Sequence, residues 1–278
     1  HTLLWYAKIK SNIKKRRDLE YYGFLSPLEY TTLEQSLKDI WRIRNFLHFI
    51  TKRRCDILHF EYQAELADLI GYRHKKGHTD VETFLGDLHN RMDFLKQIHH
   101  ISLEDILYGF RRTMAGSRPK SIKTYGLVII KKRLYFKNTV VILQKPDLLI
   151  KIFFESAKRK IPLSIAARRI VSEFLHLIDD EFIKNRNTVK IFKKIIALSS
   201  QKFNVLDIML ITGILGKLIP EFTAIINKIQ YNHYHLFPVD RHSILCVQIV
   251  NDFKKPADSK ISAFYSSVFK EIKDKKLL

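Results

Sequence analysis

Two stretches of the sequence hold side chains that could carry acid–base or metal chemistry. Arg44 and His48 lie four positions apart in a segment with helical periodicity, which places both on one face of a helix. Residues 230–242 hold three His and one Asp beside the start of another expected helix. Neutral imidazoles ligate metals when carboxylates complete the shell. A metal-dependent hydrolase of this kind also needs a His-Asp pair, and that dipeptide is absent from the sequence.

The helix face that carries Arg44 and His48 is otherwise apolar. Its stripe consists of Leu33, Leu37, Ile40, Trp41, Leu47 and Thr51. If Arg44 and His48 follow this stripe, their side chains point into the core or a cleft. If they lie at its edge, they find ordinary surface partners, and the spacing alone leaves both interpretations open.

Other patterns that would define an enzyme are missing or incomplete. A nucleotidyltransferase needs a Gly-Ser turn followed by two carboxylates that hold magnesium and the triphosphate. Gly116 and Ser117 are present, but the next acidic residue is Asp147. The sequence contains no Walker loop, G-x-G-x-x-G or G-x-S-x-G motif. His74 and His78 have ligand-like spacing, yet their basic neighbours favour a solvated loop.

Composition narrows the class of protein. The 278 residues include 49 Lys and Arg against 28 Asp and Glu, a formal net charge of +21, with 46% hydrophobic residues. Such a chain folds as one or two domains and is not disordered. Cys55 and Cys246 lie far apart, which excludes a disulfide framework and indicates a reducing, cytoplasmic setting. We expect no membrane association, because no apolar run approaches roughly 18 residues, and a start without Met predicts a piece of a longer protein.

The spacing of apolar residues predicts a mainly α fold. In the segment Ser26-Pro27-Leu28-Glu29, an N-cap Ser, a Pro at the first helical position and a Glu three residues after the cap predict a helix that runs to about Arg54. Further helices are expected at 59–70 with Gly71 as its cap, after a second capping box at Thr79 to Glu82, and at 103–111, 147–157, 164–178, 188–198, 204–218, 240–252 and 259–275.

The character of the sequence changes between Thr113 and Pro146. Short β-branched and aromatic segments at 126–130, 134–136 and 139–142 predict a small β-ribbon at the junction of two helical modules. The segment from Ile106 to Pro146 contains ten Lys and Arg and no Asp or Glu. The ribbon is therefore expected to carry a basic surface, centred on the triplet Lys131, Lys132 and Arg133.

Three blocks of sequence, in order along the chain, resemble the family of bifunctional PII uridylyltransferases and uridylyl-removing enzymes. The first block comprises Trp41-Arg-x-Arg44-x-x-Leu-His48, Asp56-x-Leu58-x-Phe60-x-x-Gln63 and Leu69-Ile-Gly-Tyr72, the second Met209 to Gly213-x-Leu-Gly with Ile219-Pro-Glu-Phe222, and the third Gln230 through Val239-Asp240-x-His242. Each block is weak alone. Their order and spacing make the resemblance specific over nearly the whole chain.

The resemblance implies a place in the middle of a longer enzyme. The family has a nucleotidyltransferase domain with an Asp-x-Asp motif, a helical linker, then a metal-dependent HD domain and glutamine-sensing domains. Residues 1–112 would follow the transferase domain, 113–235 would form the ribbon and helical linker, and 236–278 would begin a truncated HD domain. The parent would use magnesium and UTP to uridylylate a PII-type regulatory protein, whereas this chain lacks both catalytic motifs and is expected to need no cofactor.

The same resemblance suggests roles for individual residues. Arg44 and His48 match a helix packed behind the transferase domain. Together with Asp56 they would face the nucleotide or dock the two domains. His242 matches the first histidine of the HD metal site. The chain departs from the family pattern at 231–232, where His-Asp is usual, and at Arg241, where Glu is usual. A lost carboxylate and a gained cation both weaken metal binding.

Two other functions compete with this interpretation. The charge of the ribbon, with Tyr125, Tyr135 and Phe136 interleaved, is compatible with nucleic-acid binding. No recognisable nucleic-acid motif accompanies it, so nucleic acid is the less favoured partner. A scaffold that docks neighbouring domains or an acidic partner protein would use the same surface.

Overall fold

The computed structural model describes residues 4–5, 8–9, 13–72, 80–108, 120–124, 126–231, 238–253 and 260–271. The chain forms two compact units, 1–115 with 226–239 and 116–225 with 240–278. Most described residues are helical, and the one sheet among them is small. The predicted mainly α fold with a β-ribbon is therefore confirmed. The division into family domains at 112/113 and 235/236 remains a prediction.

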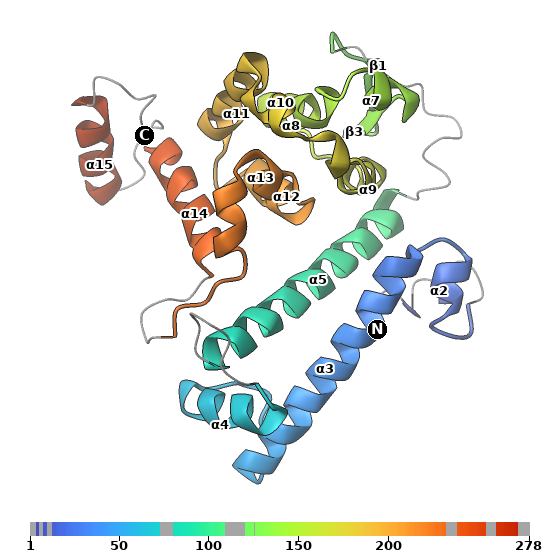
Figure 1. Ribbon diagram of the computed structural model, residues 1–278, viewed down its shortest axis with the longest axis vertical. Helices are drawn as coiled ribbons and strands as arrows, with labels where there is room; N and C mark the ends of the chain where they lie inside the picture. Colours follow the sequence, from blue (N-terminus) through green and yellow to red (C-terminus); the bar gives the residue numbers. More distant parts are fainter. Residues whose placement is uncertain are drawn as a thin grey trace. The chain divides into compact units, whose positions relative to one another are not determined.

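The first unit is built on α3 (Pro27–Thr51) and α5 (Asp80–Tyr108), with α2 (Asp18–Tyr21) and α4 (Phe60–Ile70) packed at their ends (Figure 1). The predicted capping box is present, because Glu29 N donates to Ser26 Oγ (3.2 Å) and Ser26 N donates to the Glu29 carboxylate (2.7 Å). Lys52 ends α3 in the left-handed region at φ 50°. The separate helix expected at 103–111 was wrong, since α5 continues to Tyr108. Thr79, in the second capping box, lies outside the described residues.

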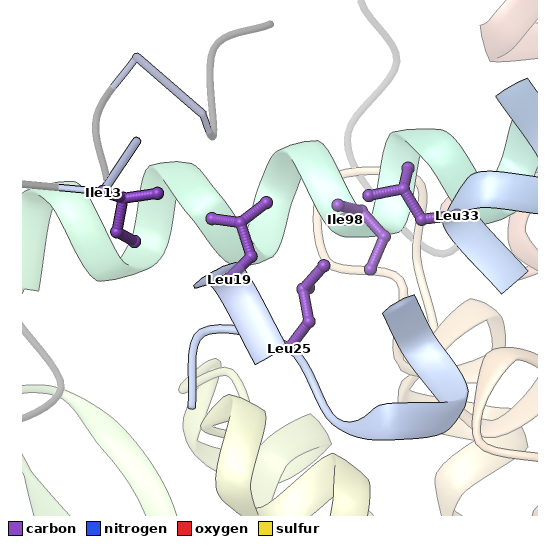
Figure 2. Packing of buried hydrophobic residues seen from close by; sticks show 5 residues of the cluster. All are labelled: Ile13, Leu19, Leu25, Leu33 and Ile98. Atoms are coloured by element: carbon purple, nitrogen blue, oxygen red, sulfur yellow. The ribbon is translucent and has the colours of Figure 1, made fainter. Parts of the chain in front are cut away.

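Two apolar clusters hold α3 against α5. At the start of α3, Leu33 packs with Ile98 of α5 in the cluster drawn in Figure 2, whose other buried members are Ile13, Leu19 and Leu25. At the end of α3, Leu47 belongs to a second cluster with Phe84 of α5 and Leu66, Ala67 and Cys55. The same number of residues, about four helical turns, separates Leu33 from Leu47 and Phe84 from Ile98. The two helices are therefore antiparallel, and one apolar cluster near each end of α3 holds them together.

The first unit also contains a segment from much later in the chain. Residues 226–231 pass over the first turns of α5, where the Asn227 carbonyl approaches Gly86 so closely that an added Cβ would lie 2.6 Å from its oxygen. Tyr231 N donates to Glu82 Oε1 (3.0 Å), and the Tyr231 ring stacks on Phe60 with centroids 4.6 Å apart. Gly86 is thus a contact point that only a residue without a side chain can fill.

The second unit begins with the β-ribbon. Strands β1 (Lys120–Ser121), β2 (Leu127–Ile130) and β3 (Arg133–Phe136) pair antiparallel in that order. Lys131 and Lys132 form the turn between β2 and β3, both with positive φ (45° and 60°), as in a type I′ hairpin turn. The strand expected at 139–142 was wrong. Those residues enter α7 (Val140–Gln144), where Asn138 Oδ1 accepts a hydrogen bond from Val141 N (2.9 Å).

Helix α8 (Leu148–Arg159) forms the centre of the second unit, with Leu149, Ile150, Ile152 and Phe153 completely buried. Its Glu155 carboxylate accepts hydrogen bonds from Thr124 beside the ribbon and from Arg159 (both 2.6 Å). Burial raises the pKa of Glu155, but these two bonds outweigh it and leave the pKa below its ordinary value. The ribbon is therefore tied to α8 by a charged hydrogen bond.

Further helices follow α8 along the chain. These are α9 (Ile165–Glu173), the 3₁₀ turn η1 (Leu175–Leu177), α10 (Asp180–Lys184), α11 (Arg186–Leu198), α12 (Val205–Ile211), α13 (Ile214–Leu218), the 3₁₀ segment η2 (Pro220–Ile225), α14 (Val239–Asp252) and α15 (Lys260–Glu271). Of these, α11 and α12 pack against α8. The helix expected over 204–218 is broken at Gly213, whose φ is 81°. Within the part of the chain that the structure describes, no helix is long and apolar enough to cross a membrane.

The close approach at Gly86 gives a test of the first unit. In an ordinary helix interior, Gly→Ala stabilises by about 1 kcal/mol. Here we expect Gly86→Ala to lower the free energy of unfolding by about 1–3 kcal/mol, because the new Cβ overlaps the Asn227 carbonyl. Urea unfolding followed by circular dichroism measures the change. A variant as stable as the original chain, or more stable, would contradict the packing of 226–231 on α5.

Candidate functional site

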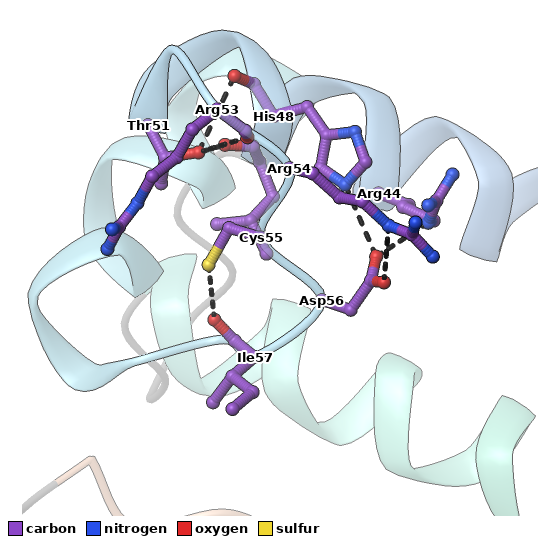
Figure 3. A network of polar contacts seen from close by, with 9 residues as sticks. Arg44, His48, Thr51, Arg53, Arg54, Cys55, Asp56 and Ile57 are labelled. Atoms are coloured by element: carbon purple, nitrogen blue, oxygen red, sulfur yellow. Dashed lines mark hydrogen bonds and ion pairs between the residues drawn. The ribbon is translucent and has the colours of Figure 1, made fainter.

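Asp56 is the centre of a polar cluster at the end of α3. Its Oδ1 accepts a hydrogen bond from Arg44 Nε (2.7 Å) and lies 3.2 Å from His48 Nε2. Arg54 Nε is 3.7 Å from the other carboxylate oxygen. Figure 3 shows the four side chains converging, with Arg44 and His48 projecting from α3 and Asp56 from the segment that follows it. These four residues are called the Asp56 cluster below.

The local sequence explains how Asp56 reaches α3. Arg44 and His48 are one helical turn apart, so both side chains point to the same side. The left-handed Lys52 reverses the chain after α3. Two hydrogen bonds then hold the segment that follows α3. Thr51 Oγ1 donates to the Arg53 carbonyl (3.0 Å), and Cys55 Sγ donates to the Ile57 carbonyl (3.3 Å).

The cluster lies at the protein surface. The side chains of Arg44 and His48 are 32% and 25% exposed, and that of Asp56 is 49% exposed. Trp41, a member of the apolar stripe, is 54% exposed, so the stripe is not buried along its whole length. The Arg44 guanidinium carbon lies 5.3 Å from the centroid of the Trp41 ring. Trp41, Arg44 and His48 thus form an exposed aromatic and basic surface, called the Trp41 face below.

Electrostatics limit the chemistry that the cluster can do. The hydrogen bond from Arg44, followed by that from His48, holds the pKa of Asp56 below its ordinary value of 3.8. A carboxylate whose ionised form is stabilised by hydrogen bonds from Arg44 and His48 is a poor proton acceptor. The arrangement therefore suits recognition and positioning better than acid–base catalysis.

A second polar cluster, which the sequence reasoning missed, joins α3 and α5 through the end of α4. Arg91 Nε donates to Asp39 Oδ2 (2.7 Å), and Tyr72 Oη donates to Asp87 Oδ2 (3.0 Å). Burial, together with the nearby Asp87 carboxylate, raises the pKa of Tyr72. The contacts border a pocket of about 260 Å³ lined by Asp39, Arg42, Ile43, Ile70, Gly71, Tyr72 and Arg91.

This second cluster gives a physical reason for the motif Leu69-Ile-Gly-Tyr72. Gly71 ends α4 in the left-handed region at φ 90°, as predicted for the cap. The turn directs Tyr72 back to α5, where its ring packs edge-on against Phe84 with centroids 5.4 Å apart. Arg42 closes the other side by donating to the Ile70 carbonyl (3.1 Å). The motif therefore determines how the end of α4 packs against α3 and α5.

His242, the expected metal ligand, lies exposed in the first turns of α14. Its Nε2 is 3.6 Å from Cys246 Sγ. Arg241 contacts Asp207 of α12 instead of a metal site (2.9 Å between Nη1 and Oδ1). The described residues contain no group of three His, Cys, Asp or Glu that could hold a metal ion. The other His of this stretch, within 232–237, lie outside the described residues, and so do His74, His78, Gly116 and Ser117.

The basic triplet of the ribbon divides between two environments. Lys131 and Lys132 are exposed at the hairpin turn, whereas Arg133 is half-buried at the start of β3. Lys120 and Lys123 are also exposed. The remaining predicted members before the ribbon, Arg111, Arg112 and Arg118, lie outside the described residues. The ribbon thus presents at least part of the basic surface that the sequence predicts.

Comparisons with known proteins find relatives of this chain. A family model described as GlnD PII-uridylyltransferase matches residues 1–103, which include all of the Asp56 cluster. Three curated relatives carry the name bifunctional uridylyltransferase/uridylyl-removing enzyme. That of Cereibacter sphaeroides is 28% identical over 91% of this chain, that of Rhodopseudomonas palustris 29% over 98%, and that of Ruegeria pomeroyi 27% over 100%.

The chain is homologous to these bifunctional enzymes. The resemblance drawn from its three sequence blocks is therefore confirmed. The match covers only 28%, 30% and 31% of the three relatives, so the chain spans about three tenths of the length of the curated relatives it matches. No solved structure matches the chain significantly.

The lowered pKa of Asp56 can be measured by following its carboxyl carbon in an NMR titration. We expect a midpoint below 3.8, because Arg44 and His48 stabilise the ionised form. Arg44→Met should raise the midpoint. Arg16→Met, which breaks a comparable ion pair between Arg16 and Glu34 of α3, should leave it unchanged. An ordinary midpoint in the unaltered chain would contradict the geometry of the cluster.

The same shift predicts how stability depends on pH. A carboxylate with a depressed pKa stabilises the folded state above its unfolded pKa, and this stabilisation is lost as the pH falls through the folded pKa. We therefore expect Asp56→Asn to unfold more easily than the unaltered chain at pH 7. The difference in the free energy of unfolding should shrink as the pH falls below 3.8 and through the lower pKa of the folded state, as urea titrations at several pH values can establish. A difference that persists in acid would contradict this linkage.

Proposed function

We propose that the chain is the central helical region of a longer uridylyltransferase-like signalling enzyme. In this proposal, the parent transfers a uridylyl group from UTP to a PII-type regulatory protein and can also remove it. The region described here positions neighbouring domains and does no chemistry itself. The observation that carries the proposal is the alignment, which covers at least 91% of this chain but no more than 31% of the three relatives.

The side chains support a positioning role for the region. Magnesium and UTP would require a cluster of carboxylates, and none of the described residues form such a group. Asp56 is already engaged by Arg44 and His48. His242 has Cys246 as a neighbour, and Arg241 contacts Asp207. The described residues therefore do not fit the metal of either reaction, and we assign no catalytic step to them.

The Trp41 face is the surface that we expect to meet the preceding transferase domain. An exposed Trp that contacts an Arg is typical of the residues that dominate protein interfaces. The Asp56 carboxylate fixes Arg44 and thereby lowers the entropy that the side chain loses on docking. Of the two roles that the resemblance suggests for Arg44, His48 and Asp56, this proposal adopts the docking of domains.

A uridylylation assay with UTP, magnesium and a PII-type protein tests whether catalysis requires parts of the longer protein beyond these 278 residues. We expect no turnover with the 278-residue chain alone and turnover with the longer protein. Appreciable turnover with the 278 residues would contradict a purely positioning role. No turnover with the longer protein would contradict its assignment as a uridylyltransferase.

Substitution of Trp41 in the longer protein tests the docking surface. We expect Trp41→Ala to reduce uridylyl transfer about tenfold, which corresponds to about 1.4 kcal/mol of lost transition-state stabilisation. The unfolding midpoint of the 278-residue chain should barely change, because the Trp41 side chain is already largely exposed.

The control for this substitution is Tyr21→Ala. Tyr21 is an exposed aromatic residue of the same unit that lies on α2, away from α3 residues Trp41, Arg44 and His48. It should leave the transfer rate unchanged. Equal losses in the two variants, or none in Trp41→Ala, would argue against the Trp41 face as a docking surface.

A further inference from the structure

A second basic surface lies away from the ribbon triplet, on helices α8 and α11, which pack side by side (Figure 1). Its centre is the half-buried ring of Phe154 on α8. Lys158 Nζ, one turn further along α8, is 5.9 Å from the ring centroid, and Lys194 Nζ of α11 is 5.7 Å from it. Two ammonium groups from different helices therefore converge on one aromatic ring.

Acidic side chains do not balance this charge. Helix α11 contains Arg186, Lys190, Lys193 and Lys194 and no Asp or Glu. On α8, the Glu155 carboxylate is occupied by Thr124 and Arg159, and Asp147 before the helix pairs with Lys151. Among the described residues, neither Lys158 nor Lys194 has an ion-pair partner within 4.0 Å. Lys158 acts on the Glu155 carboxylate through space, but among the described residues no carboxylate lies in direct contact with the ammonium group of Lys158 or Lys194.

The positively charged lysines of this surface repel one another unless an anion is bound. Lys190 and Lys194 are one turn apart on α11, and like charges at this spacing destabilise a helix. The Phe154 ring attracts both nearby ammonium groups and limits the positions that they can take. An anion with several negative charges would relieve the repulsion without reorganising the lysines.

We infer that α8 and α11 bind the phosphate chain of an anionic ligand, with Lys158 and Lys194 as the contacting residues and Lys190 beside them. Lysine ammonium groups bind phosphate as point charges, whereas bidentate recognition of a carboxylate would favour arginine. The nearby Arg159 is engaged by Glu155. The phosphate chain can belong to a free nucleoside triphosphate or to the backbone of single-stranded RNA. The inference does not depend on the proposed function.

Calorimetric titration of the 278-residue chain with inorganic tripolyphosphate tests the site. We expect saturable binding that weakens about tenfold in Lys158→Gln/Lys194→Gln, with a shallower dependence on salt because two phosphate contacts are lost. Lys158→Arg/Lys194→Arg should retain most of the affinity. The matched control is Lys202→Gln/Lys217→Gln, which removes the same charge from two exposed lysines of this unit outside α8 and α11. It should change the affinity less than twofold.

Two outcomes would overturn the inference. One is the absence of saturable binding by tripolyphosphate. The other is an equal loss in both Gln double variants, which would show that only total charge matters. Parallel titrations with UTP and a short oligouridylate identify the source of the phosphate, because the natural ligand should bind more tightly than the other and lose that affinity in Lys158→Gln/Lys194→Gln. Circular dichroism of each variant verifies its fold.

Discussion

The first unit depends on the two apolar clusters that hold α3 against α5. Leu33 and Leu47 on one helix meet Ile98 and Phe84 on the other, and the equal spacing keeps two long helices in register. Midway along these helices, Asp39 and Arg91 form an ion pair that fixes their rotation (2.7 Å). Because apolar burial supplies most of the stabilisation, the exposed Asp56 cluster at the end of α3 is available for the docking role proposed above.

Local signals made much of this fold predictable from the sequence. Ser26 and Glu29 lie within one helical turn of each other, so the start of α3 could be predicted from the sequence alone. The residues at 139–142 mislead, because Val and Ile favour strands, yet Asn138 caps them and Val141 and Ile142 enter the core. Strands and helices can both bury an apolar face, so only the tertiary packing decides which of the two residues 139–142 form.

The candidate site was less predictable because its contacts span loops. Sequence spacing placed Arg44 and His48 on one face, but it could not show that the chain after Lys52 returns Asp56 to them. Likewise, Arg91 reaches Asp39 across 52 positions. The exposure of Trp41 could not be predicted from the apolar periodicity either. Periodicity defines the stripe, but not which edge of the stripe the neighbouring helices cover.

Part of the positive charge of the chain lies on two surfaces that differ in structure. In the ribbon, Lys131 and Lys132 occupy a turn that Asn and Gly usually form, so basic residues are present there despite an unfavourable backbone conformation. On α8 and α11, lysines instead share an aromatic ring. The net charge of +21 is thus concentrated partly on separate surfaces, each with its own geometry.

Solvent access to Trp41 tests the central claim that this helical region presents a docking surface. Acrylamide quenching of tryptophan fluorescence, measured with Trp5 replaced by Phe so that Trp41 alone reports, compares the 278-residue chain with the longer protein in which other tryptophans are also replaced. The account predicts strong quenching in the 278-residue chain, where Trp41 is 54% exposed, and several-fold weaker quenching in the longer protein. Equal quenching in both would show that no domain covers the Trp41 face and would contradict the account.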